Sequence, residues 1–195
     1  MNLPNKLTVG RIVLVPFFVA ALLIDFPCNY VVALLIFIAA SITDMLDGKI
    51  ARKRNLVTDF GKFADPLADK ILVLSALLCF VQLGLCDCVS VILVLFREFS
   101  VTSVRLIAAS KGEVVAANIW GKVKTVTQMI AIILILVLQL VLQLCGMGIF
   151  GTVDVQMLSN VFTVIGLVAI WISNIFTVLS GAVYFVQNKK FISDM

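Results

Sequence analysis

The chain has 195 residues, of which 62% are hydrophobic and only 13% are charged, and its formal net charge is +4. A water-soluble domain needs a polar shell that this composition cannot supply, so we expect one integral membrane domain over residues 1–195. Histidine is absent, which excludes a histidine general base and histidine metal ligands. The five cysteines include no Cys-x-x-Cys pair, so a structural zinc site is not expected.

Six apolar segments follow one another along the chain, and about 20 apolar residues are enough to cross a bilayer as a helix. Hydropathy places them at residues 7–24, 30–47, 66–85, 89–109, 125–145 and 157–186. We therefore predict an all-α fold of six transmembrane helices. Lys6 and Arg11 precede the apolar run 12–24 of the first segment, as in a secretory signal, but no small-x-small cleavage site comes after it. It is interpreted as a retained first helix.

The positive charges are distributed unevenly between the two ends of these helices. The links at residues 25–29, 86–88 and 146–156 contain aspartate but no lysine or arginine. Every lysine and arginine except Arg97 falls on the other side. The positive-inside rule then predicts that both termini and the basic links are cytoplasmic. The short N-terminus without a transit peptide favours a bacterial cytoplasmic membrane over an organellar one.

Four aspartates stand out in this apolar chain. Asp44 and Asp47 are three residues apart, and Asp65 and Asp69 are four apart, so each pair shares one helix face. The first pair ends the second predicted helix and the second pair begins the third, which places both near the cytoplasmic headgroups. Four close carboxylates need positive charge between them, and oxygen-rich clusters suit Mg²⁺ or Mn²⁺. Two such ions could stabilise the attacking and leaving oxygens of a phosphate displacement. The alternative, ordinary interfacial charges balanced by nearby bases, suits Asp59.

Small residues and one arginine accompany the aspartates. Gly48, Ala51 and Gly61 would let a large ligand lie against the helix backbones. Arg52 could contact a diphosphate through its fork of donors. Pro66 is expected either to start the third helix, with the residue before it as a cap, or to kink that helix.

Together these residues match the signature D-x2-D-G-x2-A-R-x8-G-x3-D-x3-D with every spacing kept, and the chain resembles the CDP-alcohol phosphotransferase family. The resemblance implies six transmembrane helices, a homodimer and two metal ions held by the four aspartates. It implies that Asp69 is the base that removes a proton from an acceptor hydroxyl, and that CMP leaves. It also implies a cytidine diphosphate site at Gly48, Ala51, Arg52 and Gly61.

Three other stretches, residues 1–11, 97–105 and 114–125, resemble the phosphatidylglycerophosphate synthases within that family. The implied reaction joins CDP-diacylglycerol to sn-glycerol 3-phosphate and gives phosphatidylglycerophosphate and CMP. No nucleic acid partner is expected.

Basic residues in the second half of the chain are candidates for binding the acceptor phosphate. Arg97 lies roughly 12 Å from the outer end of its helix, a depth at which a charge is costly and usually functional or paired. Glu98 is not expected to pair with it, because sequence neighbours diverge around a helix, whereas Glu98 and Arg105 share a face. We predict that Arg97, Arg105, Lys122 and Lys124 bind the phosphate. The alternative is general attraction of these bases to anionic lipid.

Thr8 and Arg11 are three residues apart on the first helix and could face the same site. They could equally be an N-terminal cap and an interfacial anchor. Two other functions remain open. A cardiolipin synthase of the same family would use phosphatidylglycerol as acceptor. A divalent-cation transporter would need acidic residues along a pore, whereas the carboxylates here lie at one level.

Overall fold

A computed structural model describes residues 3–54, 59–113, 118–149 and 154–191, and over these residues helices joined by turns and links make up the chain, without strands. The side chains of residues 3–6, 44–54, 59–66, 69 and 191 lie outside this description. The helices are α1 (Leu3–Leu23), α2 (Asn29–Arg54), α3 (Asp59–Gln82), α4 (Cys88–Ser110), α5 (Ile119–Gly146) and α6 (Val155–Gln187), followed by a short 3-10 turn, η1 (Lys189–Phe191).

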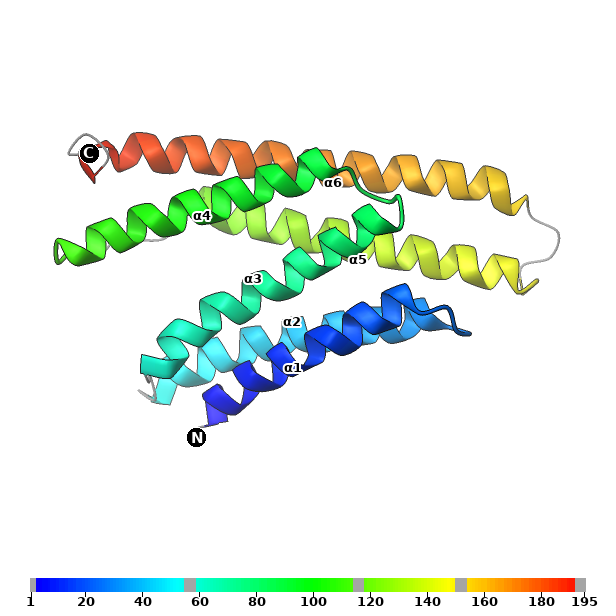
Figure 1. The fold of residues 1–195 in the computed structure, drawn as a ribbon, viewed down its shortest axis with the longest axis horizontal. Helices are drawn as coiled ribbons and strands as arrows, with labels where there is room; N and C mark the ends of the chain where they lie inside the picture. The colour runs from blue at the N-terminus through cyan, green and yellow to red at the C-terminus, as the bar shows by residue number, and fades with distance from the viewer. Residues whose placement is uncertain (1–2, 55–58, 114–117, 150–153, 192–195) are drawn as a thin grey trace.

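The helices run alternately up and down in two groups (Figure 1). α1 packs against both α2 and α3, α5 packs along α6, and α4 lies on α6. α2 contacts α5 and thereby joins the two groups. The start of α1, the end of α2 and the end of α6 lie at one end of the bundle, and the turns after α1 and α3 lie towards the other (Figure 1). Short links between long helices produce this antiparallel order.

The six predicted segments are confirmed as helices, but four of them extend further into charged sequence than hydropathy indicates. α1 begins at Leu3, α2 continues to Arg54, α3 begins at Asp59 and α5 begins at Ile119. Hydropathy detects only the apolar part of a helix, whereas charged residues continue a helix that has already formed. Because α3 begins at Asp59, Pro66 lies inside it, and the prediction that Pro66 starts this helix with Asp65 as its cap is wrong.

Acidic residues in two links serve as helix caps. The Asp87 carboxylate accepts hydrogen bonds from the Ser90 backbone N–H and hydroxyl, both at 2.8 Å, at the start of α4. Asp154 accepts from two backbone N–H groups at the start of α6. A carboxylate at a helix N-terminus pairs otherwise unsatisfied donors and opposes the helix dipole. The aspartates that mark the lysine-free links thus also fix where these helices begin.

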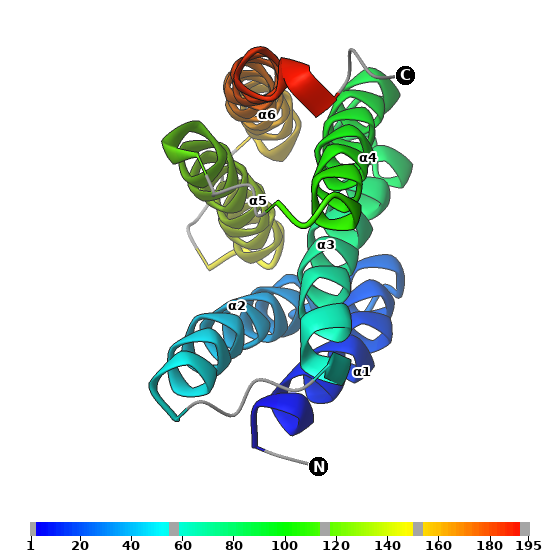
Figure 2. The same ribbon diagram turned by 90° about the vertical axis from the view of Figure 1, so that its left-hand side faces the viewer.

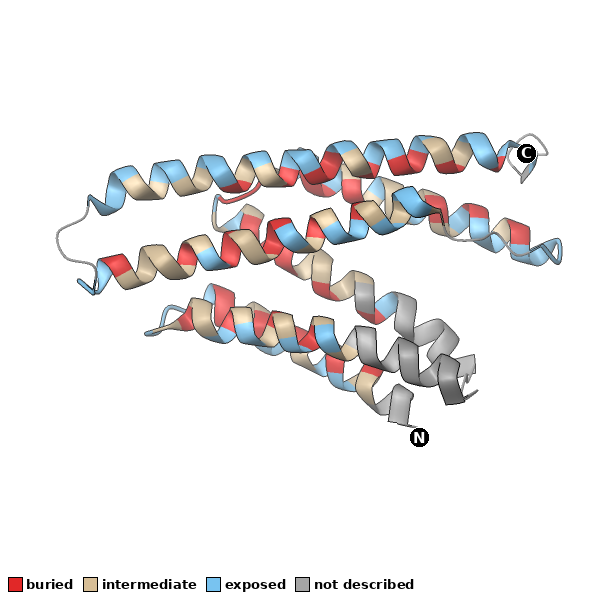
Figure 3. Ribbon diagram, turned by 180° about the vertical axis from the view of Figure 1, so that it is seen from behind, coloured by how far each residue is buried: buried red, intermediate tan, exposed pale blue. Residues whose placement is uncertain are grey.

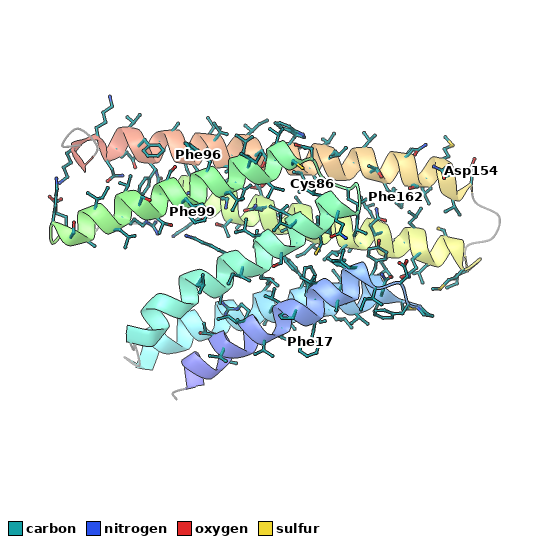
Figure 4. All side chains as sticks on the ribbon, viewed as in Figure 1. Phe17, Cys86, Phe96, Phe99, Asp154 and Phe162 are labelled. Carbon is teal, nitrogen blue, oxygen red and sulfur yellow. The ribbon has the colours of Figure 1, made fainter. Side chains whose placement is uncertain are left out.

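The exterior of the bundle is largely apolar. Among the described residues, α5 and α6 are long and apolar enough to cross a membrane, and shorter apolar stretches occupy Leu7–Leu23, Asn29–Thr43 and Lys70–Gln82. Phe17 on α1 and Phe96 and Phe99 on α4 are each more than 60% exposed (Figure 4). So many exposed large apolar side chains suit a hydrocarbon environment and would be a liability in water.

Buried side chains face the contacts between helices (Figure 3). The main core cluster contains residues of all six helices and includes Phe18 and Phe37, whose ring centroids are 5.7 Å apart. α5 and α6 pack closely where Gly166 faces Ile135. A Cβ at Gly166 would lie 3.0 Å from Ile135 Cγ1, so the two backbones can approach this closely only because the α6 residue has no side chain.

We expect Gly166→Val to lower the thermal unfolding temperature of the detergent-purified protein, because two further methyl groups would push α6 away from α5. Overpacking of this kind costs about 1–3 kcal/mol. Adding Ile135→Ala in the same chain should restore part of the loss. Gly146→Val is the matched control, since a Cβ there meets nothing within 4 Å. Equal losses for the two valine variants would contradict a close contact at Gly166.

Candidate functional site

The four motif aspartates lie on two helices, α2 and α3. Asp44 and Asp47 belong to α2, and Asp65 and Asp69 belong to α3. Their side chains, and those of Gly48, Ala51, Arg52 and Gly61, lie outside the described residues. The backbone nevertheless gives each aspartate pair the helical spacing that puts both members on one face.

A cavity of about 850 Å³ lies between α3, α4, α5 and α6. Figure 2 shows the frame around it, with α3 and α4 on one side and α5 and α6 on the other. Its charged lining residues are Lys70, Arg97, Glu98, Arg105, Lys122 and Lys124. Five of these six groups are cations and one is a carboxylate, so the described lining carries a strong excess of positive charge. Such a cavity favours an anionic ligand.

The structure brings together four of the predicted acceptor-binding residues. Arg97 and Arg105 come from α4, and Lys122 and Lys124 come from α5. The Lys124 side chain is only 6% exposed, whereas Lys122 is an exposed residue. The Arg105 guanidinium carbon lies 5.7 Å from the centroid of the Tyr184 ring, which holds this cation over an aromatic face.

Glu98 lies at the centre of this charge cluster. Its Oε1 is 2.7 Å from Lys124 Nζ and 2.8 Å from a terminal nitrogen of Arg97, and its Oε2 is 3.7 Å from Lys70 Nζ. These cations come from three helices, α5, α4 and α3. The Glu98 side chain is only 15% exposed, so its carboxylate is largely shielded from water. Its ion pairs therefore have a larger interaction energy than pairs at the surface would have.

The expectation that Glu98 would not pair with Arg97 is wrong. Adjacent Cβ atoms do diverge around a helix, but the long Arg97 side chain bends back far enough to reach the neighbouring carboxylate. The other terminal nitrogen of Arg97 donates to Ser180 Oγ on α6 at 2.6 Å. A Cβ at Gly121 or Gly181 would lie 3.4 or 3.3 Å from the Arg97 side chain, so these two glycines leave the space that Arg97 occupies.

Lys70 was not among the residues predicted from sequence. Its Nζ donates to Thr102 Oγ1 at 2.6 Å, in addition to facing Glu98. Lys70 directly follows Asp69 in α3, so the cavity borders the helix turn that carries the last motif aspartate. The position of Lys70 next to Asp69 in the sequence was the signal that could have identified it as a site residue. The direction of its side chain, however, depends on how α3 packs against α4.

Thr8 and Arg11 occupy a different place. Both are buried on α1, with Arg11 only 1% exposed, and α1 packs against α2 and α3. Neither residue is among the described lining of the cavity. The structure therefore places them beside the two helices that carry the aspartates rather than with Arg97 and Lys124.

Residues 1–186 match the profile of a protein family described as CDP-alcohol phosphatidyltransferase. The chain is 43% identical to a Bacillus subtilis protein named CDP-diacylglycerol–glycerol-3-phosphate 3-phosphatidyltransferase, over 96% of this chain and 95% of the relative. A Rickettsia bellii protein of the same name is 36% identical over 97% of both chains. An Arabidopsis thaliana protein with that name and the number 2 is 42% identical over 70% of this chain and 64% of its own length.

Arg97 on α4 contacts both Glu98 of its own helix and Ser180 of α6, and these two contacts lead to a prediction about the free energy of unfolding. Arg97→Lys should lower the free energy of unfolding by about 1–3 kcal/mol, because one ammonium group cannot replace both guanidinium bonds. The readout is thermal unfolding of the purified protein. Ser180→Ala should cost less, and the double variant should cost little more than Arg97→Lys alone, since both remove the same bond. Additive losses would mean that Arg97 does not bridge α4 and α6.

Proposed function

The chain belongs to the CDP-alcohol phosphatidyltransferase family and is an enzyme of phospholipid synthesis, and on this basis we propose that it transfers the phosphatidyl group from CDP-diacylglycerol to sn-glycerol 3-phosphate. The products would be phosphatidylglycerophosphate and CMP. Two relatives that align over nearly the full length of this chain carry the name of that activity. The observation that carries the proposal is the cationic cavity that borders the Asp69 turn of α3, because an acceptor with a phosphate group could bind there.

The four aspartates are proposed to hold two Mg²⁺ or Mn²⁺ ions. Helical backbone runs through both pairs, and an all-carboxylate donor set is the kind that these hard cations prefer. When bound, the ions would stabilise negative charge on the reacting phosphate. We assign the cytidine diphosphate to the neighbouring Gly48, Ala51, Arg52 and Gly61, whose small side chains and one forked cation suit a diphosphate close to the backbone.

The acceptor is proposed to bind with its phosphate in the cavity and its hydroxyl towards α3. Arg97, Arg105, Lys122 and Lys124 would bind the phosphate through charge-assisted hydrogen bonds. Lys70 lines the same cavity and is adjacent to Asp69, so a three-carbon acceptor held there would reach towards this aspartate. Asp69 would take the hydroxyl proton, the acceptor oxygen would bond to the lipid-bearing phosphorus, and CMP would carry away the bond electrons. Thr8 and Arg11 stay candidates for the acceptor side from α1.

We also propose that all six helices cross a bacterial cytoplasmic membrane, with both termini and the active site facing the cytoplasm. The up-and-down order of the helices and the lysine-free links after α1 and α3 support this orientation. We further propose that the protein is a homodimer, as the family resemblance implies.

The activity can be tested with purified protein, Mg²⁺ or Mn²⁺ and CDP-diacylglycerol. CMP release is expected with sn-glycerol 3-phosphate and not with phosphatidylglycerol. Asp69→Asn should lower kcat by about 100-fold or more, because general-base catalysis typically contributes 10²–10⁴-fold. Asp59→Asn, at one of the unspecified positions of the signature, is the matched control and should keep most of the activity. Release that needs phosphatidylglycerol instead would identify the cardiolipin synthase reaction.

The orientation can be tested by cysteine labelling, since all five cysteines are free thiols. A membrane-impermeant maleimide added to spheroplasts should label a variant that retains only Cys88, which is exposed in the α3–α4 region. A cysteine introduced by Lys189→Cys in a cysteine-free background should react only after permeabilisation. The opposite pattern would reverse the proposed orientation.

Cys86 provides an internal control two residues away. Its side chain is buried, and burial together with the nearby Asp87 charge raises the pKa of the Cys86 thiol to about 11. Little thiolate is then present at neutral pH, and the thiolate is the reactive form. The variant retaining only Cys86 should therefore label much more slowly than the Cys88 variant.

A further inference from the structure

Glu98 occupies an unusual position for a carboxylate, because it lies in a cavity that is otherwise suited to an anion. It is the sole acidic side chain in the described lining, and three of the five cations there face it. Lys124 and Arg97 share the same oxygen, Oε1, while Lys70 faces Oε2. Glu98 thus makes with these cations the kind of contact that a ligand phosphate would make.

Arg97 and Lys70 each have a neutral partner besides Glu98. Arg97 donates to Ser180 Oγ and Lys70 donates to Thr102 Oγ1, each at 2.6 Å. The Thr102 hydroxyl in turn donates to the Glu98 backbone carbonyl at 2.7 Å, so its place does not depend on the Glu98 side chain. These cations would therefore stay near their positions if the carboxylate gave up its contacts. This arrangement allows another anion to replace the Glu98 carboxylate at the centre of the cluster.

From this geometry we propose that Glu98 is a placeholder for the acceptor phosphate and sets how much negative charge an acceptor must bring. Without a bound acceptor its carboxylate pairs with Lys124, Arg97 and Lys70 and offsets part of their charge. An incoming phosphate competes with it for the same N–H groups. Glu98 thereby sets the threshold of attraction that an acceptor must exceed in order to bind, and this role rests on the proposed function of the cavity.

The physical consequence is a threshold against weakly charged anions. Coulomb energy scales with the product of the charges, so a phosphate monoester with two charges gains about twice as much from the cations as a phosphodiester with one. The headgroups of the surrounding lipids are phosphodiesters. A carboxylate already seated among the cations makes the cavity a poor site for those headgroups while a small dianion can still bind.

The test compares methyl phosphate, a monoester, with dimethyl phosphate, a diester, on the purified full chain without CDP-diacylglycerol. At about pH 8 methyl phosphate carries two charges, because its second pKa is about 6. Binding is measured by calorimetry and by the shift in unfolding temperature. In Glu98→Gln both affinities should rise by a similar factor, on the order of tenfold, because each probe has to displace the same carboxylate from the same cations.

Glu113→Gln is the matched control. Glu113 is an exposed carboxylate that pairs with Lys190 and is not part of the described cavity lining, so its removal should leave both affinities unchanged. Glu98→Asp covers the case in which the glutamine variant does not fold. It keeps the charge but withdraws the carboxylate by one methylene, and both affinities should rise by a smaller factor.

Weaker or unchanged binding of both probes by the Glu98 variants would overturn the placeholder role. If Glu98 had a purely structural role, or bound the ligand itself, its replacement would not raise the affinity of the protein for either probe. The wild-type CMP assay separates this outcome from failure of the proposed function. CMP release with sn-glycerol 3-phosphate, combined with no gain of affinity in either Glu98 variant, would reject the placeholder alone. A gain of affinity without CMP release would keep the anion site and reject the proposed reaction.

Discussion

The constraint on which the rest of the structure depends is the cost of keeping charged groups inside an apolar bundle. Arg97 and Lys124 are largely buried, and an unpaired buried cation would be strongly destabilising. Glu98 offsets that cost for both. Because its partners come from α3, α4 and α5, the pairing also fixes how these helices meet, and the Arg97 bond to Ser180 adds α6. The same contacts therefore offset the buried charges and hold the helices together.

This constraint divides the bundle into two kinds of interior. The main apolar core lies around Phe18 and Phe37, and residues of α4, α5 and α6 also join it. The second interior is the charged cavity between α3, α4, α5 and α6, for which small residues such as Gly121 and Gly181 leave room. α3 belongs to both, since its apolar side chains join the core while Lys70 faces the cavity. A reaction between a metal-bound donor and a phosphorylated acceptor would take place along this shared helix.

Much of this could be predicted from the sequence because it depends on local signals. Apolar runs located six helices, and spacing alone put each aspartate pair on one helix face and identified the family. The remainder depends on tertiary packing. Nothing in the order of residues reveals that Ser180 meets Arg97, 83 positions earlier, or that Lys70 turns towards α4. The Arg97–Glu98 pair was missed for a related reason, since Cβ directions do not limit a side chain as long as that of arginine.

Glu98 finally shows how folding and binding can make opposing demands on one residue. The empty protein needs a carboxylate among its buried cations, because without one their mutual repulsion and desolvation would oppose the packing of α3, α4 and α5. The bound protein needs those cations for its ligand. A covalently attached carboxylate with two oxygens meets the first demand, and a phosphate with three oxygens and up to two charges can outcompete it for the second. Hydroxyl partners such as Ser180 and Thr102 make the exchange feasible, because they hold the cations whichever anion is present.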